Sequence, residues 1–324
     1  MAEGRCRLGP IVPSSDVIDE RLGAVARTPR SGHSSSVRET RVLELLDGRD
    51  LAWMEYGLAD GAPVIAFHGS PGTGSFFAPQ SDTAARKGVR LIAPDRPGYG
   101  HSTFHPARSY ETWTRDVAQL ADHLGVDRCF VVGHSSGGPN ATACARWLGD
   151  RLSGCAIVSG WAPPEAHVSK EGMVLSYRIG QRLSLVAPRL MGVLSEAGLR
   201  RGQRGPDQAI AWMRRRLPAC DIAVMEQPDI AVAVRAELAR PLSATAGRAS
   251  VQDVTLERRL WGFRLEDIKV PVHVWHGDTD RNVLVANGAY LADTIPDASF
   301  HRVPNAGHWL IFSNFTKILD AAIA

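Results

Sequence analysis

One serine in this chain has the sequence surroundings of a reactive nucleophile. Ser135 stands in Gly133-His134-Ser135-Ser136-Gly137, after an apolar run typical of a buried strand and before a predicted helix over residues 141–148. A sharp turn from strand to helix strains the backbone of its central residue, and glycine at the flanking positions avoids a steric clash. The pattern predicts a serine hydroxyl held above the edge of a sheet. Such a hydroxyl is a weak nucleophile until a base removes its proton.

The base is expected to be a histidine, because the pKa of imidazole lies near neutral pH. Of the eleven histidines, His308 has the most favourable place, between a predicted strand (299–303) and the last predicted helix (309–323). His134 is fixed beside the serine and points elsewhere. His68 precedes a tight turn, where a structural hydrogen bond is the simpler interpretation. We therefore predict His308 as the general base.

An acid must hold this imidazole in the correct tautomer and stabilise its charged form. Trp275-His276-Gly277-Asp278-Thr279-Asp280 supplies two aspartates just after a predicted strand. We favour Asp280, with Asp278 bracing the loop; Asp278 is the second choice for the acid and Glu165 a distant third.

A tetrahedral intermediate also needs hydrogen-bond donors for its oxyanion. The amide of Ser136 is one candidate, because it opens the helix beside the nucleophile. The second is expected in His68-Gly69-Ser70-Pro71-Gly72, which follows another predicted strand. Within it the amide of Ser70 is the best candidate.

The elements around these residues alternate between strand and helix. Residues 42–45 and 51–56 predict an antiparallel hairpin. Further strands are predicted over residues 63–67, 89–93, 154–158, 270–275 and 299–303, and helices over 76–87, 110–124, 141–148, 283–295 and 309–323. Such alternation predicts an α/β fold with a mostly parallel sheet covered by helices on both faces, and ligands bind beyond the carboxyl ends of its strands.

The alternation stops over residues 161–261, which predict a helical insertion with helices over 173–185, 188–197, 207–216 and 229–238. The core is then expected over residues 39–160 and 262–324. Residues 1–38 lack sustained periodicity and are predicted to be a disordered extension. Residues 161–264 carry Lys170 and fifteen arginines against ten acids. A solvated helix face is the simpler interpretation; the alternative is that arginines such as 214–216 guide an anionic substrate.

The composition excludes several classes of protein. The chain has 324 residues, and its formal charge of +3 is too small to argue for nucleic acid. No apolar run approaches the length of a membrane span, and the N-terminus lacks the apolar block of a secretory signal. The five cysteines show no paired spacing, which favours buried thiols and the cytoplasm. No Cys/His group has the spacing of metal ligands, and no cofactor is expected.

Five motifs of this sequence together resemble those of the α/β-hydrolase superfamily. They are the glycine-flanked Ser135, the His68-Gly69-Ser70-Pro71 loop, the Asp95-Arg96-Pro97-Gly98-Tyr99-Gly100-His101-Ser102 loop, the turn that carries Asp280, and the final Gly307-His308. The order Ser135, Asp280, His308 is also that of the family. The resemblance covers roughly residues 40–160 and 262–324. It implies an eight-stranded sheet whose second strand is antiparallel, and a helical cap over the active site.

The resemblance implies a serine hydrolase acting on a small carboxylic ester, thioester or lactone. The alternatives are carbon–carbon bond hydrolysis, lyase or cyclase chemistry with the same triad, and a non-catalytic protein that binds a small molecule. Epoxide hydrolases and haloalkane dehalogenases of the family carry an aspartate nucleophile, and Ser135 argues against both. Tyr99, Trp161 and Trp309 are candidate pocket walls, with core packing as the alternative. Whether the protein is a homo-oligomer stays open.

Overall fold

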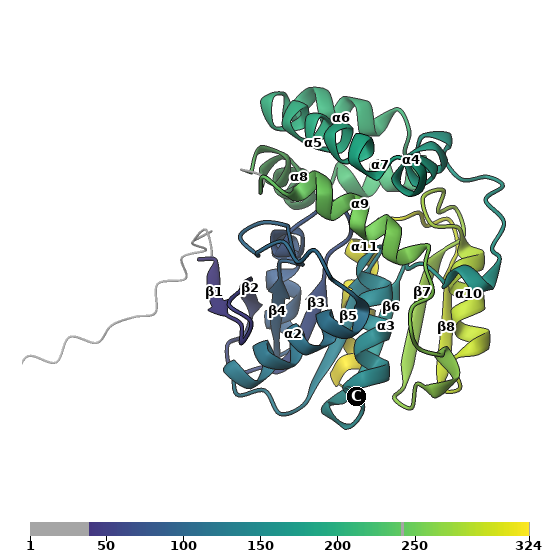
Figure 1. Cartoon of the computed structure of the whole chain (residues 1–324). Helices are drawn as coiled ribbons and strands as arrows, with labels where there is room; N and C mark the ends of the chain where they lie inside the picture. Colours follow the sequence, from purple (N-terminus) through teal and green to yellow (C-terminus); the bar gives the residue numbers. More distant parts are fainter. Residues whose placement is uncertain (1–38, 241–242, 324) are drawn as a thin grey trace, which may run out of the picture. The chain divides into compact units, whose positions relative to one another are not determined.

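The strands form one eight-stranded sheet in the order β1-β2-β4-β3-β5-β6-β7-β8. This computed structural model describes residues 39–240 and 243–323 (Figure 1). The predicted extension, residues 1–38, lies outside them. The strands are β1 (Arg41–Glu44), β2 (Asp50–Gly57), β3 (Ala62–Phe67), β4 (Val89–Pro94), β5 (Cys129–His134), β6 (Leu152–Val158), β7 (Val272–Gly277) and β8 (Ala298–Val303).

The direction of the strands agrees with the prediction. β2 runs antiparallel to both β1 and β4, and every other neighbouring pair is parallel. The central strands β3, β5 and β6 are almost wholly buried, as expected for a sheet covered on both faces. The predicted hairpin and the predicted antiparallel second strand are confirmed.

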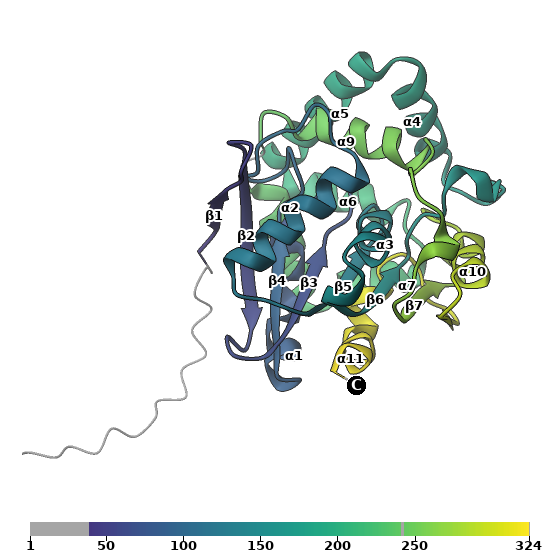
Figure 2. The same ribbon diagram turned by 60° about the horizontal axis from the view of Figure 1, so that its bottom comes forward.

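Helices cover both faces of the sheet (Figure 2). α2 (Tyr110–His123), α3 (Gly137–Trp147) and α10 (Val285–Thr294) supply one core, in which Trp113 meets Phe67 edge-on. α1 (Ser81–Arg86) and α11 (Leu310–Ile323) supply the other core, in which Phe315 packs on Phe77. The predicted helix over residues 76–87 is divided into a 3₁₀ helix, η1 (Gly74–Gln80), and α1. Pro79 lacks the amide that a continuous α-helix would need there.

The segment between β6 and β7 is helical in the part of it that the structure describes. It forms α4 (Leu175–Val186), α5 (Pro188–Arg204), α6 (Pro206–Arg214), α7 (Ala219–Met225), α8 (Pro228–Ala239) and α9 (Ala246–Glu257). We call residues 161–261 the helical segment. In Figure 1 its helices lie above the upper edge of the sheet.

Two of these helices, α7 and α9, were not predicted. α7 has seven residues, too few for a clear helical repeat, and the buried side of α9 consists largely of small or acidic residues rather than large apolar ones. α5 also extends to Arg204, beyond its predicted end at residue 197.

The described part of the chain holds no helix long and apolar enough to cross a membrane. Four cysteines are described and none is in a disulfide; Cys129, Cys144 and Cys155 are buried and Cys220 is half-buried.

Candidate active site

Ser135 occupies a strained turn between β5 and α3. Its φ is 55°, a left-handed conformation that is costly for a residue with a side chain. The turn is held by two backbone hydrogen bonds: the amide of Ser135 donates to the carbonyl of Val158 at 2.9 Å, and the amide of Gly138 donates to the carbonyl of Ser135 at 2.9 Å. The backbone therefore has the geometry that the glycine-flanked motif predicted.

Glycines make this turn sterically feasible. A Cβ at position 133 would lie 2.2 Å from the carbonyl oxygen of Gly137, and one at position 137 would lie 2.2 Å from the carbonyl oxygen of Phe67. A Cβ at position 69 would lie 3.1 Å from the Cβ of Ser135. The loop after β3 thus passes directly beside Ser135 because residue 69 has no side chain.

His308 lies on the loop between β8 and α11, and its ring contacts Asp280 from the loop after β7. Nδ1 of His308 and Oδ2 of Asp280 are 2.8 Å apart, and both residues are buried. The other carboxylate oxygen of Asp280 accepts the amides of Asn282 at 2.8 Å and Val283 at 3.0 Å. These amides fix the carboxylate, which in turn orients the imidazole.

Asp280 and His308 shift each other's pKa values in opposite directions, so that each favours the charged form of the other. Burial by itself would raise the pKa of Asp280, but the facing His308 and the hydrogen bonds from His276 and His308 hold that pKa well below its usual range. Burial likewise opposes protonation of His308, yet the Asp280 charge and its hydrogen bond raise the pKa of this imidazole above its ordinary value. Asp280 therefore stabilises an imidazolium at residue 308.

Asp278 and Glu165, the other two acids considered as partners of His308, do not contact its ring. Oδ1 of Asp278 accepts the amide of Asn305 at 2.8 Å, where Asn305 has a φ of 55°. Asp278 thus braces the strained start of the loop that carries His308. Glu165 is exposed in the short 3₁₀ helix η3 (Pro164–Ala166). Of the three, Asp280 is the one in hydrogen-bond contact with the ring.

Two further histidines are structural in this arrangement. Nε2 of His134 donates to the carbonyl of His308 at 2.9 Å, and the ring of His134 stacks on Phe76 with centroids 5.0 Å apart. Burial lowers the pKa of His134 to about 3, so its ring is neutral. His68 is fully buried, and its Nε2 accepts the amide of Arg96 at 3.0 Å.

The Ser70 amide lies on the loop after β3 and the Ser136 amide at the start of α3. Neither amide hydrogen-bonds to an acceptor in residues 39–240 or 243–323. The Ser70 hydroxyl, by contrast, lies 2.8 Å from the Tyr99 hydroxyl and 3.2 Å from the Ser250 hydroxyl. The peptide bond between Ser70 and Pro71 is cis.

A buried carboxylate from α9 organises the Ser70 loop. Oδ1 of Asp253 accepts Nη1 of Arg96 at 2.6 Å, and Oδ2 accepts the Tyr99 hydroxyl at 2.6 Å. Arg96 also donates to the carbonyls of His68 at 3.1 Å and Gly69 at 2.9 Å. Burial alone would raise the pKa of Asp253, but Arg96 and Arg108 keep that pKa far below its usual range. Arg96, Tyr99 and Asp253 therefore link the helical segment to the loop.

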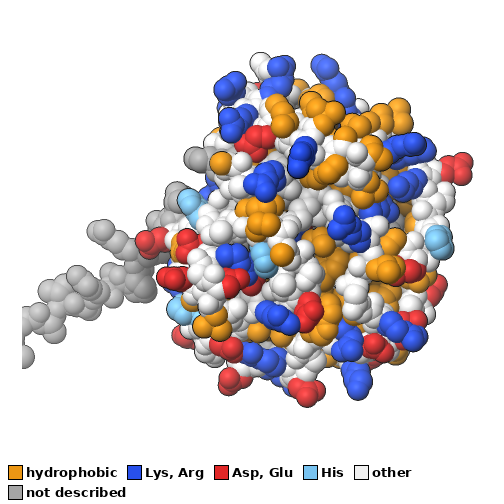
Figure 3. All heavy atoms as spheres, viewed as in Figure 1, with side chains coloured by type: hydrophobic (Ala, Val, Ile, Leu, Met, Phe, Trp, Pro, Cys, Tyr) orange, Lys and Arg blue, Asp and Glu red, His pale blue; other side chains and the backbone are white. Residues whose placement is uncertain are grey.

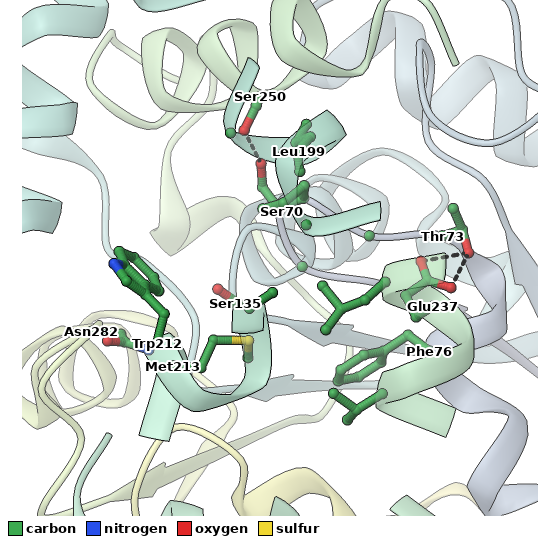
Figure 4. A pocket seen from close by; sticks show the side chains of 18 of the residues that line it. Ser70, Thr73, Phe76, Ser135, Leu199, Trp212, Met213, Glu237, Ser250 and Asn282 are labelled. Carbon is green, nitrogen blue, oxygen red and sulfur yellow. Dashed lines mark hydrogen bonds between the residues drawn. The ribbon is translucent and has the colours of Figure 1, made fainter. Parts of the chain in front are cut away.

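A cavity of about 760 Å³ lies between the helical segment and this edge of the sheet. Ser70, Ser135 and His308 all line it, and Figure 4 shows Ser135 between Phe76 and the pair Trp212 and Met213. The helical segment supplies many large apolar side chains to the cavity: Tyr177, Leu199, Trp212, Met213, Leu217, Ile230, Val234 and Leu238. It also supplies the charged side chains Arg201, Arg216, Glu237 and Arg240.

Of the three candidate wall residues, Tyr99 and Trp309 line this cavity, but Trp161 does not. Trp161 is buried against Met173 and Val283, with the guanidinium of Arg258 4.6 Å from its ring centre. The prediction of a wall at Trp161 is therefore corrected to the core-packing alternative.

A family model described as "alpha/beta hydrolase fold" matches residues 62–315. The chain belongs to the α/β-hydrolase family. The protein is an enzyme of this family.

Known relatives of the hydrolase differ in what they act on. Haloalkane dehalogenase 2 of Mycobacterium tuberculosis (strain ATCC 25618 / H37Rv) is 28% identical over 260 residues, 77% of this chain and 82% of its own. A Caulobacter sp. (strain K31) protein named for carbamate hydrolysis is 34% identical over 114 residues. That match covers 35% of this chain and only 42% of the relative.

The structure of a thermophilic esterase from Thermogutta terrifontis superposes with a TM-score of 0.62 and 26% identity, over 87% of this chain and 97% of the esterase. These relatives support hydrolase chemistry in general and leave the substrate to be proposed.

On the face that Figure 3 shows, basic side chains in the upper part, where the helical segment lies, are separated by apolar and other side chains. Arg214 pairs with Glu226, whereas Arg216 stacks on Trp212 at 3.8 Å and lines the cavity. Of the arginines at 214–216, Arg216 is therefore the one that lines the cavity.

In residues 39–240 and 243–323, no group of three or more His, Cys, Asp or Glu side chains is arranged so that it could hold a metal ion.

Asp253 is one residue near this site that sequence reasoning missed. It follows Ala246 and Ala249 at helical spacing, so it stands on the buried side of α9. Because the buried side of α9 is largely small or acidic, no apolar stripe in the sequence marked the position of Asp253 as buried.

Proposed function

We propose that the protein is a serine hydrolase that cleaves a carboxylic ester, thioester or lactone with a large apolar group, through an acyl-enzyme. The observation that carries the proposal is the contact between Nδ1 of His308 and the buried Asp280 carboxylate, with His308 and Ser135 lining the same cavity. In this tautomer Nδ1 bears the hydrogen, so Nε2 is the nitrogen left to accept the serine proton.

In the proposed reaction the Ser135 oxygen attacks the substrate carbonyl while His308 takes its proton. The amides of Ser70 and Ser136 donate to the oxyanion of the tetrahedral intermediate. His308 then gives the proton to the departing alcohol, thiol or ring oxygen, and the acyl group stays on Ser135. A water molecule, deprotonated by His308, attacks this ester, which releases the acid and restores the serine.

The size and lining of the cavity support a bulky apolar substituent. Its volume of about 760 Å³ lies within the range of pockets that enclose drug-sized ligands, and the helical segment contributes mainly aliphatic and aromatic side chains to it. Burying an apolar chain there contributes about 0.8 kcal/mol for each methylene. We therefore expect kcat/KM to rise with acyl length until the cavity is full.

A panel of p-nitrophenyl esters of graded acyl length, together with lactones and acyl thioesters, tests the proposal. We expect turnover that increases from acetyl to medium-chain esters and is absent in Ser135→Ala and His308→Ala. Absence of turnover on all three substrate classes by folded protein would contradict it. If folded protein turned over none of these but did cleave a carbon–carbon bond substrate added to the panel, the lyase or carbon–carbon hydrolase alternative would be supported.

A further inference from the structure

A second buried carboxylate of the helical segment, that of Asp221, contacts the loop that carries His308. Asp221 lies in α7, and only 1% of its surface is exposed. Its Oδ2 accepts the amide of His308 at 3.0 Å, and its Oδ1 accepts the amide of Trp309 at 2.9 Å. A single carboxylate therefore fixes two successive peptide units, one of which belongs to the proposed base.

The contact between Asp221 and the His308 loop requires a residue without a side chain at position 307. A Cβ at position 307 would lie 2.4 Å from both carboxylate oxygens of Asp221. Any other residue there would push the carboxylate away from the two amides. Asp221 can therefore reach the two amides only because residue 307 is glycine, although 87 residues separate Asp221 from His308.

We propose that Asp221 is a positioning residue, which holds the His308 loop so that the imidazole contacts Asp280 and lines the same cavity as Ser135. Hydrogen bonds from amides to a carboxylate are stronger than those between neutral groups, so Asp221 is suited to the task. Because α7 belongs to the helical segment, placement of the base depends on that segment being docked. This inference rests on the proposed function, since it takes His308 to be the general base.

Asp221 also acts on the charge of His308. The titratable groups that face this ring are Asp280 from the loop after β7, Asp221 from α7 and His134 from β5, while His276 contacts Asp280 from β7. Burial opposes protonation of His308, and the Asp280 and Asp221 charges raise its pKa. Removal of the Asp221 charge should therefore lower that pKa and move the acid limb of the kcat/KM profile to lower pH.

The test compares Asp221→Asn with Asp229→Asn in the full-length protein, using p-nitrophenyl butyrate. Asp229 is exposed in the first turn of α8 and serves as the matched control. We expect Asp221→Asn to lower kcat about 10- to 100-fold, with KM within about threefold of the parent value and the acid limb at lower pH. The inference is overturned if Asp221→Asn keeps the parent kcat and acid limb, or changes them no more than Asp229→Asn does.

Asp221→Glu gives a second, independent comparison. It keeps the charge but moves the carboxylate by one methylene, so we expect a lower kcat with an unmoved acid limb. If Asp221→Asn does not fold, as judged by circular dichroism, Asp221→Glu decides: full kcat in a folded Asp221→Glu variant overturns the inference. Failure of the proposed function would look different, because the parent protein itself would then show no turnover that depends on Ser135.

Discussion

The Tyr99 hydroxyl lies 2.6 Å from Oδ2 of Asp253, although 154 residues separate the two in sequence. Tyr99 follows β4, and Asp253 belongs to α9 in the helical segment. Since the only hydrogen of the tyrosine hydroxyl goes to Asp253, the Ser70 hydroxyl must donate to Tyr99 at 2.8 Å. Hydrogen bonds are therefore donated in one direction, from Ser70 to Tyr99 and from Tyr99 to Asp253, and they join α9 to the loop whose amide is proposed to bind the oxyanion.

Tyr99→Phe should weaken catalysis through this chain. The substitution removes the hydroxyl that joins Ser70 to Asp253 and leaves the buried ring in place. We expect kcat for p-nitrophenyl butyrate to fall about tenfold, equivalent to about 1.4 kcal/mol, with little change in KM. Tyr290→Phe, in α10 and away from the cavity, is the control. Equal kcat values for the two variants would show that the chain does not support the oxyanion site.

Asp280→Asn and Asp278→Asn separate the two aspartates of one turn. Asp280 contacts the imidazole at 2.8 Å, whereas Asp278 contacts the amide of Asn305. We expect Asp280→Asn to lower kcat about 10³- to 10⁴-fold, because the imidazole loses the acceptor that fixes its tautomer. Asp278→Asn should stay within about threefold of the parent. The reverse order of the two effects, measured by steady-state kinetics, would assign the acid to Asp278.

Gly198→Leu should shorten the preferred acyl chain. Gly198 lines the cavity from α5, and a Cβ there would meet no atom within 4 Å. Leucine also favours the helix over glycine. We expect kcat/KM to fall about tenfold or more for medium-chain p-nitrophenyl esters and to change little for the acetate. Gly180→Leu in α4 is the control, because residue 180 has the same free space but does not line the cavity. An unchanged chain-length profile would place the acyl group elsewhere.

Glu257→Gln should stabilise the protein at alkaline pH. Glu257 is buried at the end of α9, and burial, with the Asp253 charge adding to it, raises its pKa from 4.5 to about 7. The folded state therefore holds this proton more tightly than the unfolded chain. Its contribution to stability is complete below pH 4.5 and is lost as the pH rises through about 7. Glutamine does not titrate, so this loss should be absent in the variant.

The measurement is the free energy of unfolding of both proteins in urea at pH 5 and pH 8. Relative to the parent, Glu257→Gln should gain up to about 3 kcal/mol between these two pH values. A difference between the proteins that does not change with pH would mean that Glu257 is not protonated in the folded state.

The fold and the residues around Ser135 could be predicted because their signals are local. Glycines at 133 and 137 are needed because a side chain at either position would clash with the backbone of the same turn or of a neighbouring strand. The strands β3, β5 and β6 are recognisable as short, continuous apolar runs. The place of His308 followed from the end of the last strand. The contact between His308 and Asp280 was predicted from the topology of a parallel sheet, in which strand ends meet at one edge.

The helices α7 and α9 could not be predicted because their burial depends on partners distant in sequence. Asp221 and Asp253 look like surface acids until the loops after β8 and β4 supply amides, a guanidinium and a hydroxyl for them. Trp161 was assigned alternatively to the cavity and the core for a similar reason. Its neighbour Met173 belongs to the helical segment, whereas Val283 lies in the loop between β7 and α10.

The central claim, that Ser135 is an activated nucleophile, is tested most directly by labelling with a fluorophosphonate. We expect the intact protein to form a covalent adduct on Ser135, located by mass spectrometry of its peptides. Labelling should be lost in Ser135→Ala and strongly slowed in His308→Ala, although both variants remain folded. Folded parent protein that stays unlabelled, or that carries the label on a residue other than Ser135, would contradict the account.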